Sequence, residues 1–190
     1  MPFNIPNLLT WLRILLIPVF VVFYYLPAGW FDKQTINLLA VSVFGVAAIT
    51  DWLDGYLARK LNQMSAFGAF LDPVADKLMV AAALILLLQL GRVDAVVAFI
   101  IIGREIAISA LREWMAGVGH GKSVAVALIG KLKTASQMIA IFLLLYHEPI
   151  GPIAPHEAGT WLIYLAAILT VASMAYYIFQ AFSSDRKPAN

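Results

Sequence analysis

The sequence contains no cysteine and few charged residues. Without cysteine the chain has no disulfides, thiolate nucleophiles, zinc–thiolate sites or iron–sulfur clusters, so any metal must take oxygen or histidine ligands. Asp, Glu, Lys and Arg make up 13% of the 190 residues, about half of their usual share in soluble domains. The formal net charge is +2 and is spread among apolar runs. We therefore expect no nucleic-acid partner, because such a surface needs clustered Lys and Arg.

Apolar residues are in excess. They make up 62% of the chain, against roughly 45–50% in an average domain, which argues against both a disordered chain and a water-soluble globule. The length favours a single integral membrane domain over residues 1–190. A transmembrane helix needs about 20 mostly apolar residues, and six such runs predict an all-α bundle of six transmembrane helices in a lipid bilayer. The runs are Ile5 to Leu26, Thr35 to Arg59, Phe67 to Leu90, Val93 to Met115, Ser123 to Tyr146 and Thr160 to Phe182.

The distribution of basic residues predicts the orientation in the membrane. Six spans place both termini on the same side, and the N-terminus lacks the basic cluster and cleavage site of a signal peptide. Lys33 and Arg92 fall in loops on the opposite side. Because cytoplasmic loops carry the excess of Lys and Arg, we expect both termini to be cytoplasmic. The basic residues on the side of the termini are Arg59, Lys60, Lys122, Arg186 and Lys187.

Four aspartates within the predicted spans are the most informative residues, because an ionisable group at mid-membrane depth costs about 2.5–3.5 kcal/mol. Asp51 and Asp54 lie near the end of the second span, and Asp72 and Asp76 near the start of the third. Their spacings of three and four place each pair on one face of its helix. At 1.5 Å per residue, both pairs lie roughly 6–12 Å inside the cytoplasmic ends of their helices.

Four carboxylates in a pocket of low dielectric constant need protons or cations, and two divalent cations balance their charge. Oxygen ligands favour Mg²⁺, Mn²⁺ or Ca²⁺, and paired ions about 3.5–4 Å apart catalyse displacement at phosphorus. We therefore expect a polar, metal-binding cavity that opens to the cytoplasmic side. Helix capping, or pairing with Arg59 and Lys77, is the alternative explanation of the aspartates, although four on two facing helices exceed what capping requires.

The residues around the aspartates form a pattern of fixed spacing. Asp51-x-x-Asp54-Gly55-x-x-Ala58-Arg59, then eight residues, then Gly68-x-x-x-Asp72-x-x-x-Asp76 resembles the signature of the CDP-alcohol phosphotransferases at every position. The segments Gly103-Arg104-Glu105-Ile106 and Gly130-Lys131-x-Lys133-Thr134-x-x-Gln137-Met138 resemble the bacterial branch of this family that makes phosphatidylglycerophosphate.

This resemblance implies a reaction. The phosphatidyl group of CDP-diacylglycerol would pass to the primary hydroxyl of sn-glycerol 3-phosphate, with release of CMP, in the bacterial cytoplasmic (inner) membrane. It also implies a homodimer and metal held by Asp51, Asp54 and Asp72, for which the charge argument above predicts two divalent cations, Mg²⁺ or Mn²⁺. Asp76 would be the general base, next to a metal. The positions that would hold the cytidine diphosphate are Asp54, Gly55, Ala58, Arg59 and Gly68.

A phosphorylated acceptor needs cations, and four basic residues in or near the fourth and fifth spans could supply them. Alternatively, Arg104 and Arg112 pair with the neighbouring Glu105 and Glu113, or Lys133 extends outward toward lipid headgroups. The four candidates for the acceptor phosphate are Arg104, Arg112, Lys131 and Lys133.

Other polar residues give weaker signals. Thr10 and Arg13 are candidates for assisting at the headgroup, with helix capping and snorkelling as competing explanations. The three histidines, His120, His147 and His156, fall in or at loops on both sides of the membrane. We expect them not to cluster and therefore predict no histidine metal site.

Other functions also place carboxylates at membrane depth. A transporter or proton relay does so, but its pathway should be lined across the whole membrane, whereas these charges gather at one end. A prenyltransferase uses paired aspartate motifs with magnesium, without the Gly55, Ala58, Arg59 and Gly68 spacing. Within the family, the closest alternatives are enzymes whose acceptor is inositol phosphate, serine or phosphatidylglycerol.

Overall fold

The computed structural model describes residues 5–60, 66–117 and 128–184. Within these ranges the secondary structure is helical, apart from one isolated bridge between Ile150 and Ile153. The all-α prediction and its six helices are confirmed. The helices are α1 (Ile5–Val22), followed by the 3₁₀ turn η1 (Phe23–Tyr25), then α2 (Lys33–Lys60), α3 (Ala66–Gln89), α4 (Ala95–Gly117), α5 (Leu128–Tyr146) and α6 (Pro155–Ser184).

Most helix ends lie close to the predicted ones, and the start of α6 is the clearest difference. This helix begins at Pro155, five residues before the predicted Thr160. Proline is favoured in the first turn of a helix, where its missing N–H has no partner to lose, and Glu157 complements the positive end of the helix dipole. The helix therefore extends beyond the apolar run from which it was predicted. The predicted start of α5 at Ser123 lies outside the described residues.

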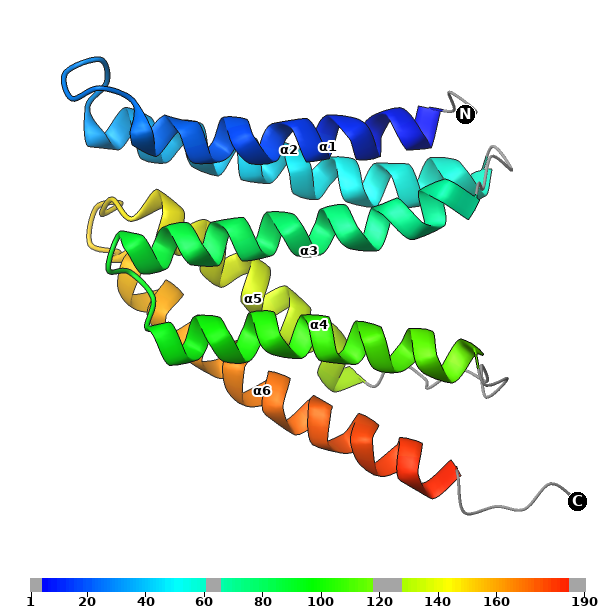
Figure 1. Cartoon of the computed structure of the whole chain (residues 1–190). Coiled ribbons are helices and arrows are strands. Elements are labelled where there is room, and N and C mark those ends of the chain that lie inside the picture. The colour runs from blue at the N-terminus through cyan, green and yellow to red at the C-terminus, as the bar shows by residue number, and fades with distance from the viewer. Residues whose placement is uncertain (1–4, 61–65, 118–127, 185–190) are drawn as a thin grey trace, which may run out of the picture.

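The helices form two groups (Figure 1). α1, α2 and α3 pack against one another, α4 and α5 pack against α6, and the two groups meet where α5 contacts α2 and α3, and α4 contacts α3. We call the end of the bundle where α1 begins and α2 ends the aspartate end. The opposite end, with connections 26–32, 90–94 and 147–154, is called the loop end. α1 begins and α6 ends at the aspartate end of the bundle.

Apolar side chains and close helix approach hold the bundle together. Phe44 is buried on α2, and its ring packs edge-on against that of Phe142 on α5 with centroids 5.2 Å apart. Gly159 on α6 lies so close to α5 that an added Cβ would come within 2.8 Å of Leu144 Cγ. Small residues of this kind allow helices to pack tightly in a membrane, where water exclusion does not drive their association.

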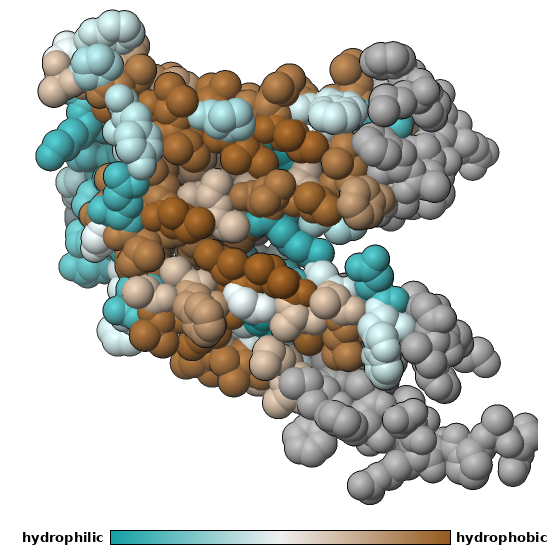
Figure 2. Space-filling model, in the orientation of Figure 1, coloured by the Kyte–Doolittle hydropathy of each residue, from teal (hydrophilic) through white to brown (hydrophobic). Residues whose placement is uncertain are grey.

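The outward faces of the bundle are apolar. Leu15, Phe99 and Ile168, on three different helices, are among the large hydrophobic side chains that are exposed. Figure 2 shows a band of hydrophobic residues between the two ends, with hydrophilic residues at the loop end and in a notch that opens toward the aspartate end. A surface of this kind requires a lipid environment.

Among the residues that the structure describes, three segments are long and apolar enough to cross a membrane: Asn7–Tyr25, Lys33–Asp54 and Pro155–Ala175. The remaining helices are less apolar. Every membrane-length stretch of α3 contains Asp72, Asp76 and Lys77, α4 contains Arg104 and Glu105, and the apolar part of α5 is short. The charged residues that make α3, α4 and α5 less apolar than the other helices include those of the candidate site. Lys122, Arg186 and Lys187, on which part of the predicted orientation depends, lie outside the described residues.

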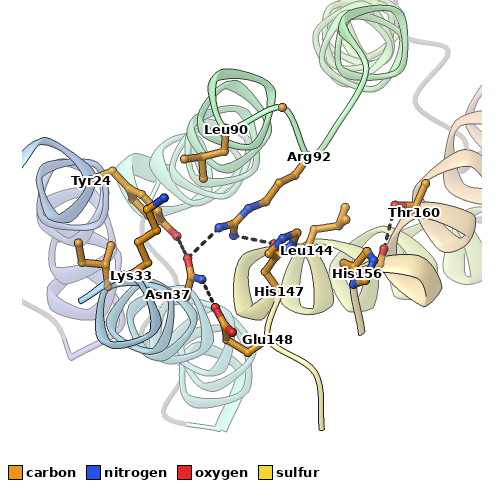
Figure 3. A pocket seen from close by; sticks show the side chains of 12 residues that line it. Tyr24, Lys33, Asn37, Leu90, Arg92, Leu144, His147, Glu148, His156 and Thr160 are labelled. Carbon is orange, nitrogen blue, oxygen red and sulfur yellow. Dashed lines mark hydrogen bonds between the residues drawn. The ribbon is translucent and has the colours of Figure 1, made fainter. Parts of the chain in front are cut away.

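A polar network connects the helices at the loop end, around a cavity of about 640 Å³ (Figure 3). Arg92 donates hydrogen bonds to the carbonyl oxygens of Leu144 and Leu145 at the end of α5, both at 3.0 Å. It also donates to Oδ1 of the buried Asn37, at 3.1 Å. Asn37 in turn donates to Glu148, at 3.4 Å. These contacts tie the start of α2 and the connection after α3 to the end of α5.

His147 directly follows the last residue of α5, and its backbone lies in the left-handed region, with φ of 62°. Its N–H donates to the Leu143 carbonyl oxygen at 3.0 Å, which closes the last turn of the helix. The His147 and His156 rings have centroids 5.3 Å apart, so the expectation that the histidines do not cluster is wrong for this pair. The end of α5 and the start of α6 lie side by side here, and the sequence pattern did not predict that this brings the two histidines together. His120 lies outside the described residues.

His147 should make the stability of the protein depend on pH. Burial, Arg92 and His156 all lower the pKa of His147, so the unfolded chain binds the proton more readily than the folded one. The free energy of unfolding should therefore decrease as the pH falls below about 6.5. His147→Asn, which tolerates the left-handed backbone, should weaken this dependence in melting curves recorded in detergent between pH 8 and pH 5. Parallel curves for the variant and the wild type would contradict the assignment.

Candidate active site

Arg13 lies at the centre of the aspartate end. Its side chain, on α1, is 1% exposed, and Nη1 lies 2.7 Å from Asp51 Oδ1. Nη2 donates to Asp54 Oδ2 at 2.5 Å. One helical turn earlier, the Thr10 hydroxyl donates a hydrogen bond to Asp72 Oδ1. α1 therefore contacts the aspartates of both α2 and α3, and brings them to the same level of the bundle.

The prominence of Thr10 and Arg13 differs from the prediction, which gave them only a supporting role at the headgroup. Both side chains are buried, and neither extends toward the membrane surface. Arg13 is therefore a partner of both Asp51 and Asp54, whereas the side chain of Arg59, the partner considered from the sequence, lies outside the described part of the structure. Removing one member of a buried ion pair leaves an uncompensated charge and is strongly destabilising.

The two aspartates of α2 have different surroundings. Asp54 is buried, whereas the Asp51 side chain is 45% exposed. Gly68, in the first turn of α3, is also buried, and a residue without a side chain leaves room for close approach of other groups. Gly55, Ala58 and Arg59 lie in the last turns of α2, but their side chains lie outside the described part of the structure.

A second group of charges surrounds a cavity of about 220 Å³ between α3, α4 and α5. Lys133 is 3% exposed and donates a hydrogen bond to Glu105 Oε1. Arg104 Nη1 lies 3.7 Å from Glu105 Oε2, and Arg104 Nη2 donates to Ser173 Oγ on α6 at 3.1 Å. Glu105 therefore holds two cations at the cavity. We call this space, lined by Asp76, Lys77, Val80, Arg104, Glu105, Gly130, Lys133, Thr134, Gln137 and Met138, the basic cavity.

These contacts decide between the alternatives for two basic residues. The Arg104–Glu105 ion pair considered from the sequence is present, but Arg104 also lines the basic cavity. Lys133 is buried at the same cavity, so its proposed extension toward the lipid headgroups is wrong. Arg112 and Lys131 lie in α4 and α5, and their side chains are outside the described part of the structure.

Asp76 connects the two groups of charges. It is exposed and lines the basic cavity together with Lys133. It also lines a small space of about 10 Å³ that Arg13 lines as well. The fourth aspartate of the pattern therefore lies between the three aspartates contacted by α1 and the cations on α4 and α5.

The carboxylates have the right chemistry for a divalent cation. Their donor atoms are all oxygen, as Mg²⁺ and Mn²⁺ prefer, and the exposed Asp51 and Asp76 can be reached from outside the bundle. In the described ranges, no three acidic or histidine side chains form a group that could hold a metal ion, and Arg13 and Thr10 contact Asp51, Asp54 and Asp72. The donor set fits such ions, and Arg13 competes with them for the same oxygens.

Glu105 and Gln137 are residues of this site to which the sequence analysis gave no role. Glu105 was considered only as a partner of Arg104, and it contacts Lys133 on another helix as well. Gln137 lies one turn after Lys133 on α5 and lines the same cavity. The sequence could have indicated Gln137, because it lies four positions after Lys133 and therefore on the same face of the helix.

A buried charge network at one end of an apolar helical bundle, built on two aspartate pairs, is the arrangement expected of an enzyme that acts on a charged substrate at a membrane. The chain belongs to the CDP-alcohol phosphatidyltransferase family, whose sequence model matches residues 3–172. This range includes every candidate residue described above.

The relatives of this chain are more specific. The chain is 49% identical over 183 residues to the CDP-diacylglycerol–glycerol-3-phosphate 3-phosphatidyltransferase of Escherichia coli strain K12. It is equally similar to the proteins of the same name from Salmonella typhimurium strain LT2 and Salmonella paratyphi A. Each match covers 95% of this chain and 96% of the relative.

Proposed function

We propose that this chain transfers the phosphatidyl group of CDP-diacylglycerol to sn-glycerol 3-phosphate, forming phosphatidylglycerophosphate and CMP. The structural observation that carries the proposal is the position of Asp76 between the aspartates at α1 and the cations of the basic cavity. The names of relatives that are 49% identical over 95% of the chain support the same reaction. A diphosphate donor at the aspartates and a phosphorylated acceptor at the basic cavity would meet at Asp76.

The reaction forms one phosphorus–oxygen bond and breaks another. The primary hydroxyl oxygen of the acceptor bonds to the phosphorus of the phosphatidyl group, and the bond from that phosphorus to the CMP oxygen breaks. CMP leaves with the bonding electron pair. Asp76 accepts the hydroxyl proton, because an alkyl hydroxyl is a poor nucleophile at neutral pH without a base.

Two divalent cations, Mg²⁺ or Mn²⁺, belong to this proposal. Asp51, Asp54, Asp72 and Asp76 would hold them, and the cations would supply charge stabilisation at the diphosphate. Arg13 keeps Asp51 and Asp54 together at the level of Asp72. Gly55, Ala58, Arg59 and Gly68 would contact the cytidine diphosphate, as the family pattern implies.

The proposal also includes the membrane in which the enzyme lies and its orientation there. We propose that all six helices span the bacterial inner membrane, with both termini and the aspartate end facing the cytoplasm, where the water-soluble substrate is available. Charges within α3, α4 and α5 would then face the interior of the bundle, as expected of ionisable residues in membranes. We also propose a homodimer, which chemical cross-linking in native membranes would test.

The acceptor phosphate should depend on Lys133. Lys133→Met removes a buried cation at the basic cavity, and the loss of a charge-assisted contact should raise the KM for glycerol 3-phosphate about tenfold or more. The KM for CDP-diacylglycerol should change much less. Steady-state rates with one substrate varied and the other saturating measure both constants.

Two further variants complete this experiment. Lys133→Arg should retain most of the affinity, because it keeps the charge. Lys33→Met, an exposed lysine at the loop end, should change neither constant. An equal increase of both KM values in Lys133→Met would instead make Lys133 a residue that organises the bundle, and would move the phosphate to Arg104, Arg112 or Lys131.

The proposed function is tested by giving the purified protein CDP-diacylglycerol in mixed micelles with a panel of acceptors and measuring CMP release. We expect release with glycerol 3-phosphate and little with inositol phosphate, serine or phosphatidylglycerol. Release with one of the other acceptors alone would change the acceptor but keep the reaction class. No release with any acceptor, in the presence of Mg²⁺ or Mn²⁺, would overturn the proposal.

A further inference from the structure

Gln137 is a buried polar residue whose amide oxygen lacks a partner. Its side chain is 3% exposed, and no donor in the described part of the chain hydrogen-bonds to Oε1. An acceptor that is removed from water without a hydrogen bond costs free energy, so each such group in a folded protein calls for an explanation. Gln137 lines the basic cavity, and the last torsion of a glutamine side chain turns over a broad range at little cost. A donor inside the cavity can therefore reach this oxygen.

The cavity defines the kind of molecule that could provide the donor. Its volume of about 220 Å³ is below the roughly 300–1,000 Å³ of pockets for drug-sized ligands, which indicates a small molecule. Arg104 and Lys133 supply two cationic groups to its wall beside Glu105, which contacts both, and Asp76 on α3 supplies a second carboxylate. Gln137, one helical turn from Lys133, adds a neutral hydrogen-bonding group. A small molecule with an anionic group and more than one hydroxyl matches all three.

The acceptor of the proposed reaction has three polar groups, and two of them already have partners. Its phosphate would pair with Arg104 and Lys133 of the basic cavity, and its primary hydroxyl would transfer a proton to Asp76. The secondary hydroxyl remains. We propose, on the basis of the proposed function, that Gln137 accepts a hydrogen bond from this secondary hydroxyl and thereby selects a polyol phosphate over acceptors that lack the hydroxyl.

This contact should act on specificity rather than on stability. A site built to pair with a hydroxyl discriminates against an analogue without it, because the buried polar group is then left unpaired. An apolar side chain in place of Gln137 should remove the discrimination, because the secondary hydroxyl of glycerol 3-phosphate then has no acceptor and the analogue no longer leaves an amide oxygen unpaired. The quantity that reports the contact is therefore the ratio of kcat/KM for two acceptors, in which effects on the phosphate or on the donor cancel.

The experiment compares glycerol 3-phosphate with 3-hydroxypropyl phosphate, which keeps the phosphate and the primary hydroxyl but lacks the secondary one. The wild type should prefer glycerol 3-phosphate about tenfold or more in kcat/KM. Gln137→Met, similar in length and without a strong acceptor, should bring the ratio close to one, mainly by lowering the value for glycerol 3-phosphate. Gln137→Glu retains a carbonyl-type oxygen and should keep the preference.

Thr134→Val is the matched control. Thr134 lines the same cavity, but its hydroxyl donates to the Gly130 carbonyl oxygen of its own helix at 3.0 Å, so its removal should leave the ratio unchanged. Equal losses with both acceptors in Gln137→Met would overturn the proposal, because they indicate a structural role. A wild type that turns over both acceptors equally would also overturn it, even if no Gln137 variant folds. Failure of the proposed function is distinct, since it appears as a wild type that releases no CMP with glycerol 3-phosphate.

Discussion

Asp51→Asn and Asp72→Asn should each lower the rate of CMP release about a hundredfold or more. Each change removes one negative charge and one proposed cation ligand from a set of four carboxylates, and in the proposed reaction both the cations and the substrate diphosphate depend on that set. The two residues belong to different helices and contact Arg13 and Thr10, respectively. A large effect of both changes would therefore show that α2 and α3 act at one site.

Metal dependence is measured with the same assay. Excess EDTA should abolish turnover and added Mg²⁺ or Mn²⁺ should restore it. The cations should also raise the melting temperature of the wild type, because a ligand that binds only the folded state stabilises it, and this shift should be smaller in Asp51→Asn.

Asp94→Asn is the control. Asp94 lies at the loop end and accepts a hydrogen bond from Val96 N–H at 2.8 Å, and the variant should behave as the wild type because asparagine also caps helices. Full activity in the chelator would contradict the two-cation proposal.

Asp76→Asn should separate chemistry from binding. If Asp76 is the general base, turnover should fall at least a hundredfold, in the range that general-base catalysis typically contributes. The affinity for CDP-diacylglycerol should change little, because the lost function acts in the transition state. Single-turnover rates and equilibrium binding of the donor, measured on the same preparation, give the two quantities.

The alternative outcome is informative as well. A donor affinity that falls as much as the rate would make Asp76 principally a cation ligand. A normal rate would remove it from the reaction altogether, and would leave the space between Arg13 and the basic cavity without a base. Asp94→Asn again serves as the control for an Asp-to-Asn change outside the site.

The helices could be predicted from the sequence because each is largely one apolar run bounded by polar residues. The third predicted run, Phe67 to Leu90, corresponds closely to Ala66–Gln89. The prediction failed at the start of α6, where the helix continues through polar residues that packing and helix-end chemistry stabilise. The sequence predicted six spans, whereas three helices in the described part of the chain are apolar enough to cross a membrane without help from their neighbours.

The membership of the candidate site was predictable, but the contacts within it were not. The aspartates were identified because an ionisable residue within an apolar run is costly and therefore indicates a function. The same argument applies to Arg13, but it does not predict which residues Arg13 contacts. Arg13 and Asp54 are 41 positions apart, and Thr10 and Asp72 are 62 apart. Pairing over such distances depends on which helices pack together. The contact of Lys133 with Glu105 and the orphaned oxygen of Gln137 likewise depend on how α4 and α5 face each other.

The ion pairs of Arg13 affect how the protein enters the membrane during synthesis. α1 precedes α2 in the chain, so Arg13 emerges from the ribosome before Asp51 and Asp54. A lone arginine within a membrane helix costs about 2.5–3.5 kcal/mol on insertion scales, whereas the hairpin of α1 and α2 carries its own counter-charges. The connection between the two helices is short, residues 26–32, so the second helix follows without delay. The α1–α2 hairpin is thus the smallest unit in which Arg13 has its counter-charges, and the more polar helices can insert against it.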